Sequence, residues 1–173
     1  MECKEELLDG IQKEGWTVCD APVPGYDSGD AVECAASCRK NLCGSYGTTW
    51  ACPPGWSTSM EELGRRFDKA LVIEKTFVGG PDDAPRMSAE LHRTMRRIVM
   101  SLRSEGRDCM GFADGACDYC GVCAYPEPCR FPEQLLPSVS ALGVDMGKYL
   151  SSVGKTFSFV DGKVTLYGIV MYR

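Results

Sequence analysis

The sequence has a single histidine, an excess of negative over positive charge, and no long apolar run. Its 19 lysines and arginines face 24 aspartates and glutamates, a formal net charge of -5. We therefore expect repulsion from phosphate backbones and anionic lipid, and no nucleic-acid or membrane partner. No apolar run approaches the roughly 20 residues of a membrane-spanning helix. The first ten residues carry charges where a secretory signal would be apolar, and we expect a cytoplasmic location.

The chain is unusual in having eleven cysteines among 173 residues. Its length suits one domain over residues 1–173 whose core needs no metal or disulfide in order to fold. A reducing compartment disfavours disulfides, so the cysteines call for another explanation. Spacing sorts them into two groups and three isolated thiols. The first group is Cys34, Cys38, Cys43 and Cys52, and the second group is Cys117, Cys120, Cys123 and Cys129. The isolated thiols are Cys3, Cys19 and Cys109.

Periodicity and turn signals predict an α+β fold. We expect an antiparallel-rich sheet with helices on one side, with a ferredoxin-like sandwich as the first guess, and two cysteine-rich metal-binding loops. Asp161-Gly162 indicates a hairpin turn that pairs Phe159 with Val164 and Phe157 with Leu166. The other expected elements are helices at 2–13, after Asp30, from Ser59 to Phe67, at 88–105 and near 138–150, and strands at 69–78 and 107–113.

The second cysteine group, in the site at residues 115–133, has the spacing C-x2-C-x2-C-x5-C. Three thiolates within seven residues converge only if the backbone wraps around something compact. Bacterial ferredoxins use C-x2-C-x2-C for three ligands of one cubane cluster, whereas zinc sites usually combine two separated C-x2-C pairs. The spacing favours a [4Fe-4S] cluster, with Cys129 as the fourth ligand. Structural zinc bound by the same residues remains the alternative.

The first group, in the site at residues 30–56, has the looser spacing C-x3-C-x4-C-x8-C. Asp30 and Glu33 have the form of a capping box, which predicts that a helix starts there. Cys34 and Cys38 then lie one turn apart on one helix face. If Cys34 is a ligand, the site has four thiolates, which favours electron transfer or structure. If it is not, a cluster there has one iron open to substrate.

Taken together, the motifs C-x4-C-x2-YG-x4-CPP and C-x2-C-x2-C-x5-CR-x-PE resemble a prokaryotic family of predicted metal-binding proteins, domain of unknown function 2284. The resemblance continues through Pro137, Ser138, Gly143 and Asp145, although Ser140 stands where the family tends to have glutamate. It implies metal binding, most plausibly iron-sulfur. It makes Tyr46 and Arg130 candidate cofactor-binding residues beside the eight cysteines. The matching residues are Cys38, Cys43, Tyr46, Gly47, Cys52, Pro53, Pro54, Cys117, Cys120, Cys123, Cys129, Arg130, Pro132 and Glu133.

These patterns lead to a hypothesis with two alternatives. The leading one is a protein with two [4Fe-4S] clusters that exchanges electrons with a redox partner. The first alternative is an enzyme whose first cluster has an open iron for sulfur removal or Lewis-acid chemistry; the second is a zinc-stabilised interaction module. His92, next to an apolar helical stripe, is interpreted as structural rather than catalytic. The arginines at 93, 96, 97 and 103 form a solvated face or dock an acidic redox partner.

Overall fold

The computed structural model describes residues 4–156, 159–160 and 162–173. The helices are α1 (Lys4–Lys13), α2 (Ser28–Arg39), α3 (Met60–Arg66), α4 (Ala84–Ser104) and α5 (Met146–Ser152). Short 3-10 helices are η1 (Pro81–Asp83), η2 (Pro132–Gln134) and η3 (Val139–Leu142). The strands are β1 (Thr17–Ala21), β2 (Lys69–Val78), β3 (Cys109–Phe112), β4 (Phe159–Val160) and β5 (Lys163–Tyr172).

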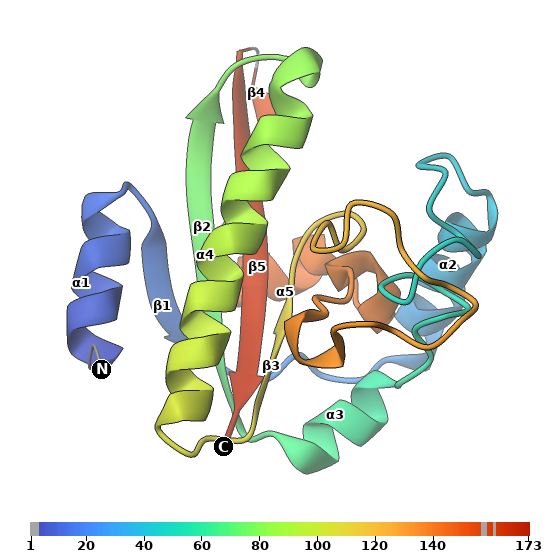
Figure 1. The fold of residues 1–173 in the computed structure, drawn as a ribbon, viewed down its shortest axis with the longest axis horizontal. Helices are drawn as coiled ribbons and strands as arrows, with labels where there is room; N and C mark the ends of the chain where they lie inside the picture. Colours follow the sequence, from blue (N-terminus) through green and yellow to red (C-terminus); the bar gives the residue numbers. More distant parts are fainter. Residues whose placement is uncertain (1–3, 157–158, 161) are drawn as a thin grey trace.

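The strands form one sheet in the order β1-β2-β5-β3, and every neighbouring pair is antiparallel. The short strand β4 pairs with the start of β5. Because β2 and β3 both run antiparallel to β5, they are parallel to each other with β5 between them. Helix α4 connects them, which makes a split β-α-β unit, a component of ferredoxin-like folds. The predicted α+β class is confirmed (Figure 1).

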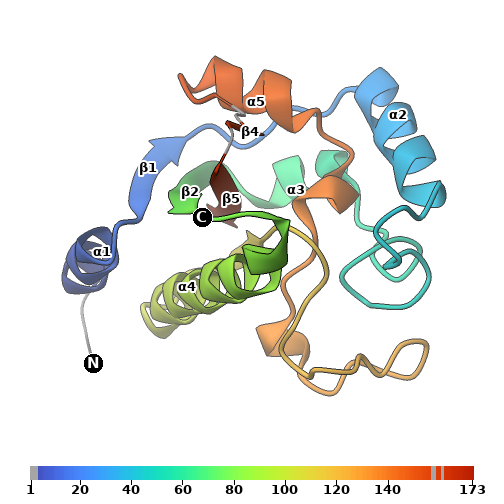
Figure 2. The same ribbon diagram turned by 90° about the horizontal axis from the view of Figure 1, so that it is seen from above.

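Helices cover both faces of the sheet, not one as the sequence suggested. Helices α1 and α4 pack on one face, while α3, η3 and α5 pack on the other (Figure 2). The reason lies in the apolar run of β2. Leu71 and Ile73 point into the core beneath α4, and the alternate residues Ala70 and Val72 point into the opposite core. A strand that is apolar on both faces requires cover on both.

Several predicted element boundaries are confirmed and others are corrected. Strand β2 has the predicted bounds, and α3 begins with the predicted capping box of Ser59 and Glu62. Helix α2, however, begins at Ser28, because the side chain of Asp27 accepts the Asp30 amide at 2.9 Å. Asp30 therefore lies within the first turn. Helix α4 begins four residues before the predicted Ser88, with Pro85 in its first turn, where proline costs no hydrogen bond.

The C-terminal third differs from the prediction in one place. The helix expected near 138–150 is divided into η3 and α5 by Gly143, whose φ of 70° is left-handed. Residues Phe159 and Val164 pair as predicted. The predicted partner of Leu166, Phe157, and the turn residue Asp161 lie outside the described residues. Leu166 and Val164 pack against the core beneath α4.

The two cysteine-rich segments lie together on one side of the molecule, next to α2 and away from α1 (Figures 1 and 2). Apart from η2, the segments at 40–58 and 113–138 form turns and bends rather than regular elements. In the described part of the chain, no helix has the length and apolar character needed to cross a membrane.

Candidate metal centre

The first cysteine group is built where α2 faces the segment around η3. Cys34 Sγ lies 3.6 Å from the carbonyl oxygen of Val144, and Cys38 Sγ lies 3.9 Å from that of Ser140. The close approach depends on Gly143, where an added Cβ would lie 3.2 Å from Ala31 Cα on the helix. The helical spacing therefore brings both thiols to one interface, as predicted.

The loop after α2 brings the other two cysteines of the group into electrostatic contact with this pair. Burial raises the pKa of the Cys34 and Cys38 thiols, and the second cause is a neighbouring cysteine in each case, Cys38 and Cys43 respectively. Burial also raises the pKa of Cys52 to about 11, with further contributions from Cys43 and Cys38. Each of these thiolates makes the ionisation of its neighbours less favourable. All of them are therefore ionised together only when a bound cation compensates their charge.

A cavity of about 220 Å³ lies beside the Cys34 and Cys38 thiols. Trp56 and Pro53 line it from the loop, and Ser140 lines it from the η3 side. The donor set is sulfur only, which suits iron-sulfur clusters and zinc and disfavours the hard cations calcium and magnesium. The donor types of the first group therefore suit a thiolate-bound metal.

The second cysteine group lies on a loop that Arg96 of α4 holds at two points. The Arg96 guanidinium pairs with Asp118 at 2.8 Å and donates to the Gln134 carbonyl at 3.1 Å. Its Nη2 also lies 3.4 Å from Cys117 Sγ. One cation therefore joins the beginning of the loop to its end and contacts a candidate ligand directly.

His92, one turn before Arg96, contacts the same loop. Nε2 lies 2.7 Å from the carbonyl oxygen of Asp114. Nδ1 lies 2.9 Å from Asp118 Oδ1, and this is an ion-pair contact because its geometry is not that of a hydrogen bond. Burial opposes ionisation of Asp118, but the bonds and charges of His92 and Arg96 outweigh it and lower its pKa to about 2. His92 is buried and bonded as a structural histidine is.

The two cysteine loops pack against each other through Trp50. Its indole Nε1 donates to the carbonyl oxygen of Glu127 at 2.8 Å, and its ring meets the Tyr125 ring edge-on at 5.1 Å between centroids. A Cβ at Gly55 would collide with the Thr49 carbonyl oxygen and crowd Tyr125. The amide of Ser138 adds a backbone bond to Ala51 at 2.9 Å. The loops that carry the two groups therefore form one unit.

The other candidate residues have different positions. Tyr46 is half-buried in the first loop, and its amide donates to Asn41 Oδ1 at 2.9 Å. Arg130 donates to the Val122 carbonyl and so braces the second loop. Cys19 and Cys109 belong to the sheet, and Cys3 lies outside the described residues. Across the described ranges, no three histidine, cysteine, aspartate or glutamate side chains converge closely enough to hold a metal ion.

Fold and site together define a class: an α+β protein that presents two groups of four cysteines. The first group lies on α2 and the loop after it, and the second lies on a loop packed against that first loop. The family profile described as "predicted metal-binding protein (DUF2284)" matches residues 30–172. The chain belongs to this family of predicted metal-binding proteins. The match includes both cysteine groups, Tyr46 and Arg130. Comparisons with curated proteins and with solved structures gave no significant match.

Proposed function

We propose that the protein holds two [4Fe-4S] clusters, one in each cysteine group, and transfers electrons between them and a redox partner. The observation that carries the proposal is the contact of the two cysteine-rich segments through Trp50. When bound, such clusters supply reversible one-electron transfer. With two centres on adjoining loops, an electron can enter at one centre and leave from the other. A structural role for a metal would not require two adjoining centres.

In the first site, Cys34, Cys38, Cys43 and Cys52 would be the ligands. The position of Cys34 supports its inclusion, since it lines the same cavity as Cys38 and the charge on Cys38 raises its pKa. Trp56 lines this cavity and would shield a cluster there from water. A dry surrounding is one of the factors that set the potential of a cluster.

In the second site, Cys117, Cys120, Cys123 and Cys129 would be the ligands. Arg96 has two functions there. It fixes the loop through Asp118 and Gln134, and it places a positive charge 3.4 Å from Cys117 Sγ. Donors to ligand sulfur favour the more negative, reduced state, so Arg96 would raise the potential of this site relative to a site without such a donor.

A second candidate function is enzymatic, with an open iron at the first site that removes sulfur or acts as a Lewis acid. The exposed position of Cys43 and the hydroxyl groups of Ser57 and Thr58 around the cavity favour access of a small molecule. This function requires that Cys34 is not a ligand. It therefore makes the opposite prediction for a Cys34 variant.

Metal and sulfide analysis of protein purified without oxygen tests the proposal. We expect about eight irons and about eight sulfides per chain, with an absorbance band at about 400 nm. A variant with serine at Cys109, which lies in β3 and outside both groups, should keep the same content. A colourless protein with stoichiometric zinc and no sulfide would contradict the proposal and indicate a structural zinc module.

A further inference from the structure

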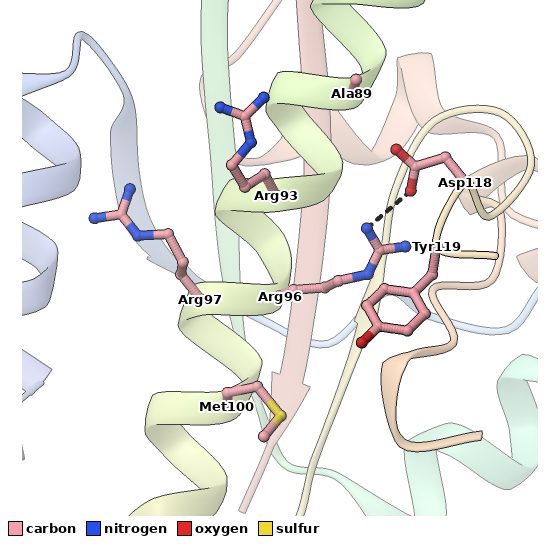
Figure 3. A pocket seen from close by; sticks show the side chains of 7 residues that line it. All are labelled: Ala89, Arg93, Arg96, Arg97, Met100, Asp118 and Tyr119. Atoms are coloured by element: carbon pink, nitrogen blue, oxygen red, sulfur yellow. Dashed lines mark ion pairs between the residues drawn. The ribbon is translucent and has the colours of Figure 1, made fainter. Parts of the chain in front are cut away.

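The outer face of α4 forms a shallow concavity beside the second cysteine loop. Its volume is about 530 Å³, and side chains from the helix and from the loop line it (Figure 3). We call this surface the arginine face. Its lining residues are Ala89, Arg93, Arg96, Arg97, Met100, Asp118 and Tyr119.

The arginine face is positive, although the protein as a whole is negative. Three guanidinium groups and a single carboxylate line the concavity, while the chain carries a net charge of -5. Arg96 is paired with Asp118, and Arg97 is paired at 2.8 Å with Glu14, the residue that follows α1. Arg93 is exposed and, within the residues described, has no carboxylate in ion-pair contact. Its charge remains available to an approaching anion.

Exposed apolar side chains lie next to these charges. Met100 and Tyr119 are 43% and 45% exposed, and Phe131, which meets the Tyr119 ring edge-on at 5.2 Å, is 41% exposed. The Arg96 guanidinium lies 5.0 Å from the centre of the Tyr119 ring. Arginine, tyrosine, methionine and phenylalanine are the residue types enriched at protein interfaces. These side chains give the face apolar contact area in addition to its charge.

The arginine face is also next to the candidate second site. Tyr119 lies between Cys117 and Cys120 in the sequence, and Arg96 contacts both the Tyr119 ring and Cys117 Sγ. A protein bound over Tyr119 would therefore lie against the loop that carries these ligands.

We propose that the arginine face is the docking surface for an acidic electron-transfer protein, an inference that rests on the proposed electron-transfer function. The positive face selects an acidic surface and orients it, and the apolar side chains supply the contact area. A [4Fe-4S] cluster held by the second cysteine group would accept one electron from the reduced partner, with no bond or proton exchanged. Nucleic acid is disfavoured because the net charge of the chain repels it.

Titration calorimetry with an acidic two-cluster ferredoxin tests the proposal, with a basic cytochrome c as the probe of opposite charge. We expect the ferredoxin to bind, with an affinity that falls as salt is raised, and the cytochrome to bind more weakly. Arg93→Glu should weaken ferredoxin binding about tenfold, and Arg93→Glu combined with Arg97→Gln should weaken it further. The matched control is Arg65→Glu on α3, an exposed arginine that does not line the arginine face, which should bind as the wild type does.

Three results would overturn the docking proposal: no salt-sensitive binding of the ferredoxin, an equal loss in Arg65→Glu, or self-association of the chain that Arg93→Glu abolishes. The last result would assign the face to a second copy of the protein. Iron and sulfide content, measured on each variant, separates the two proposals. Full content without ferredoxin binding refutes the docking surface alone, whereas zinc without sulfide refutes the electron-transfer function.

Discussion

His92 Nδ1 lies 2.9 Å from Asp118 Oδ1, and this contact joins the middle of the longest helix to the second cysteine loop. The other ring nitrogen, Nε2, lies 2.7 Å from the Asp114 carbonyl oxygen. Each ring nitrogen therefore lies close to an oxygen of the loop, although the Nδ1 contact is not aligned as a hydrogen bond. The single histidine of the chain thus lies between α4 and two acidic residues of the second loop.

We expect the titration midpoint of His92 to lie above its ordinary value of about 6.5. Burial disfavours the imidazolium, but Asp118 and the Asp114 carbonyl outweigh it and raise the pKa. Because the folded state has the higher pKa, His92 stabilises the fold fully below about pH 6.5, and this contribution is lost as the pH rises through the folded-state value. The chain has one histidine, so a single imidazole NMR signal reports the midpoint.

The comparison variant is Asp118→Asn, which removes the charge and should lower the midpoint. Asp9→Asn is its matched control, since Asp9 is exposed on α1 and pairs with Lys13, away from His92 in the sequence. A wild-type midpoint at or below 6.5, or equal midpoints in the wild type and Asp118→Asn, would show that Asp118 does not hold the proton on His92.

Replacement of Trp50 by phenylalanine should loosen the contact between the two cysteine loops. The ring contact with Tyr125 can persist, but the hydrogen bond to the Glu127 carbonyl is lost. We expect the metal-free protein to lose about 1 kcal/mol of unfolding free energy, the usual net contribution of one such bond. Denaturant unfolding measures this loss, and hydrogen exchange should show faster exchange in both loops. Exchange that changes in the first loop alone would contradict the coupling.

Replacement of Gly168 by alanine should destabilise the packing of α4 on the sheet. A Cβ at this buried position of β5 would overlap Met95 Sδ and lie 2.8 Å from Met95 Cε. We expect a cost of about 1 to 3 kcal/mol, as for other overpacked cores. The control is Gly64→Ala on α3, where nothing lies within 4 Å of the added carbon, and which should be neutral or slightly stabilising. Equal melting temperatures for the two variants would refute this account.

The elements that sequence patterns predicted well are those whose stability is local. The stripe of Leu91, Met95, Ile98 and Leu102 is fully buried, and the pairing of Phe159 with Val164 is confirmed. Strand β1 was missed, because its five residues gain stability only by pairing with β2. The division of the helix after Ser138 depends on the close approach of Gly143 to Ala31, which is a tertiary contact.

For the candidate site, spacing indicated which cysteines belong together but not how their loops are held. The hydrogen bond between Trp50 and Glu127 joins residues 77 positions apart in the sequence, so no local sequence pattern predicts it. The sequence contained one signal of how the second loop is held, which is Asp118. A carboxylate between two candidate thiolate ligands adds negative charge, and that charge requires a nearby cation. Arg96 supplies the cation, and the His92 ring lies one turn away on the same side of α4.

The variant Cys34→Ser distinguishes the carrier from the enzyme. If four thiolates hold the first cluster, serine at this position should lower iron from about eight to about four per chain and leave the second site occupied. The physical reason is the position of Cys34, which shares a cavity with Cys38 and approaches it closely enough for their charges to interact. Cys19→Ser is the matched control, because Cys19 is a half-buried thiol of β1 outside both groups. Full iron content in Cys34→Ser would show that this residue is not an obligatory ligand, and the first site would then have an open iron suited to catalysis.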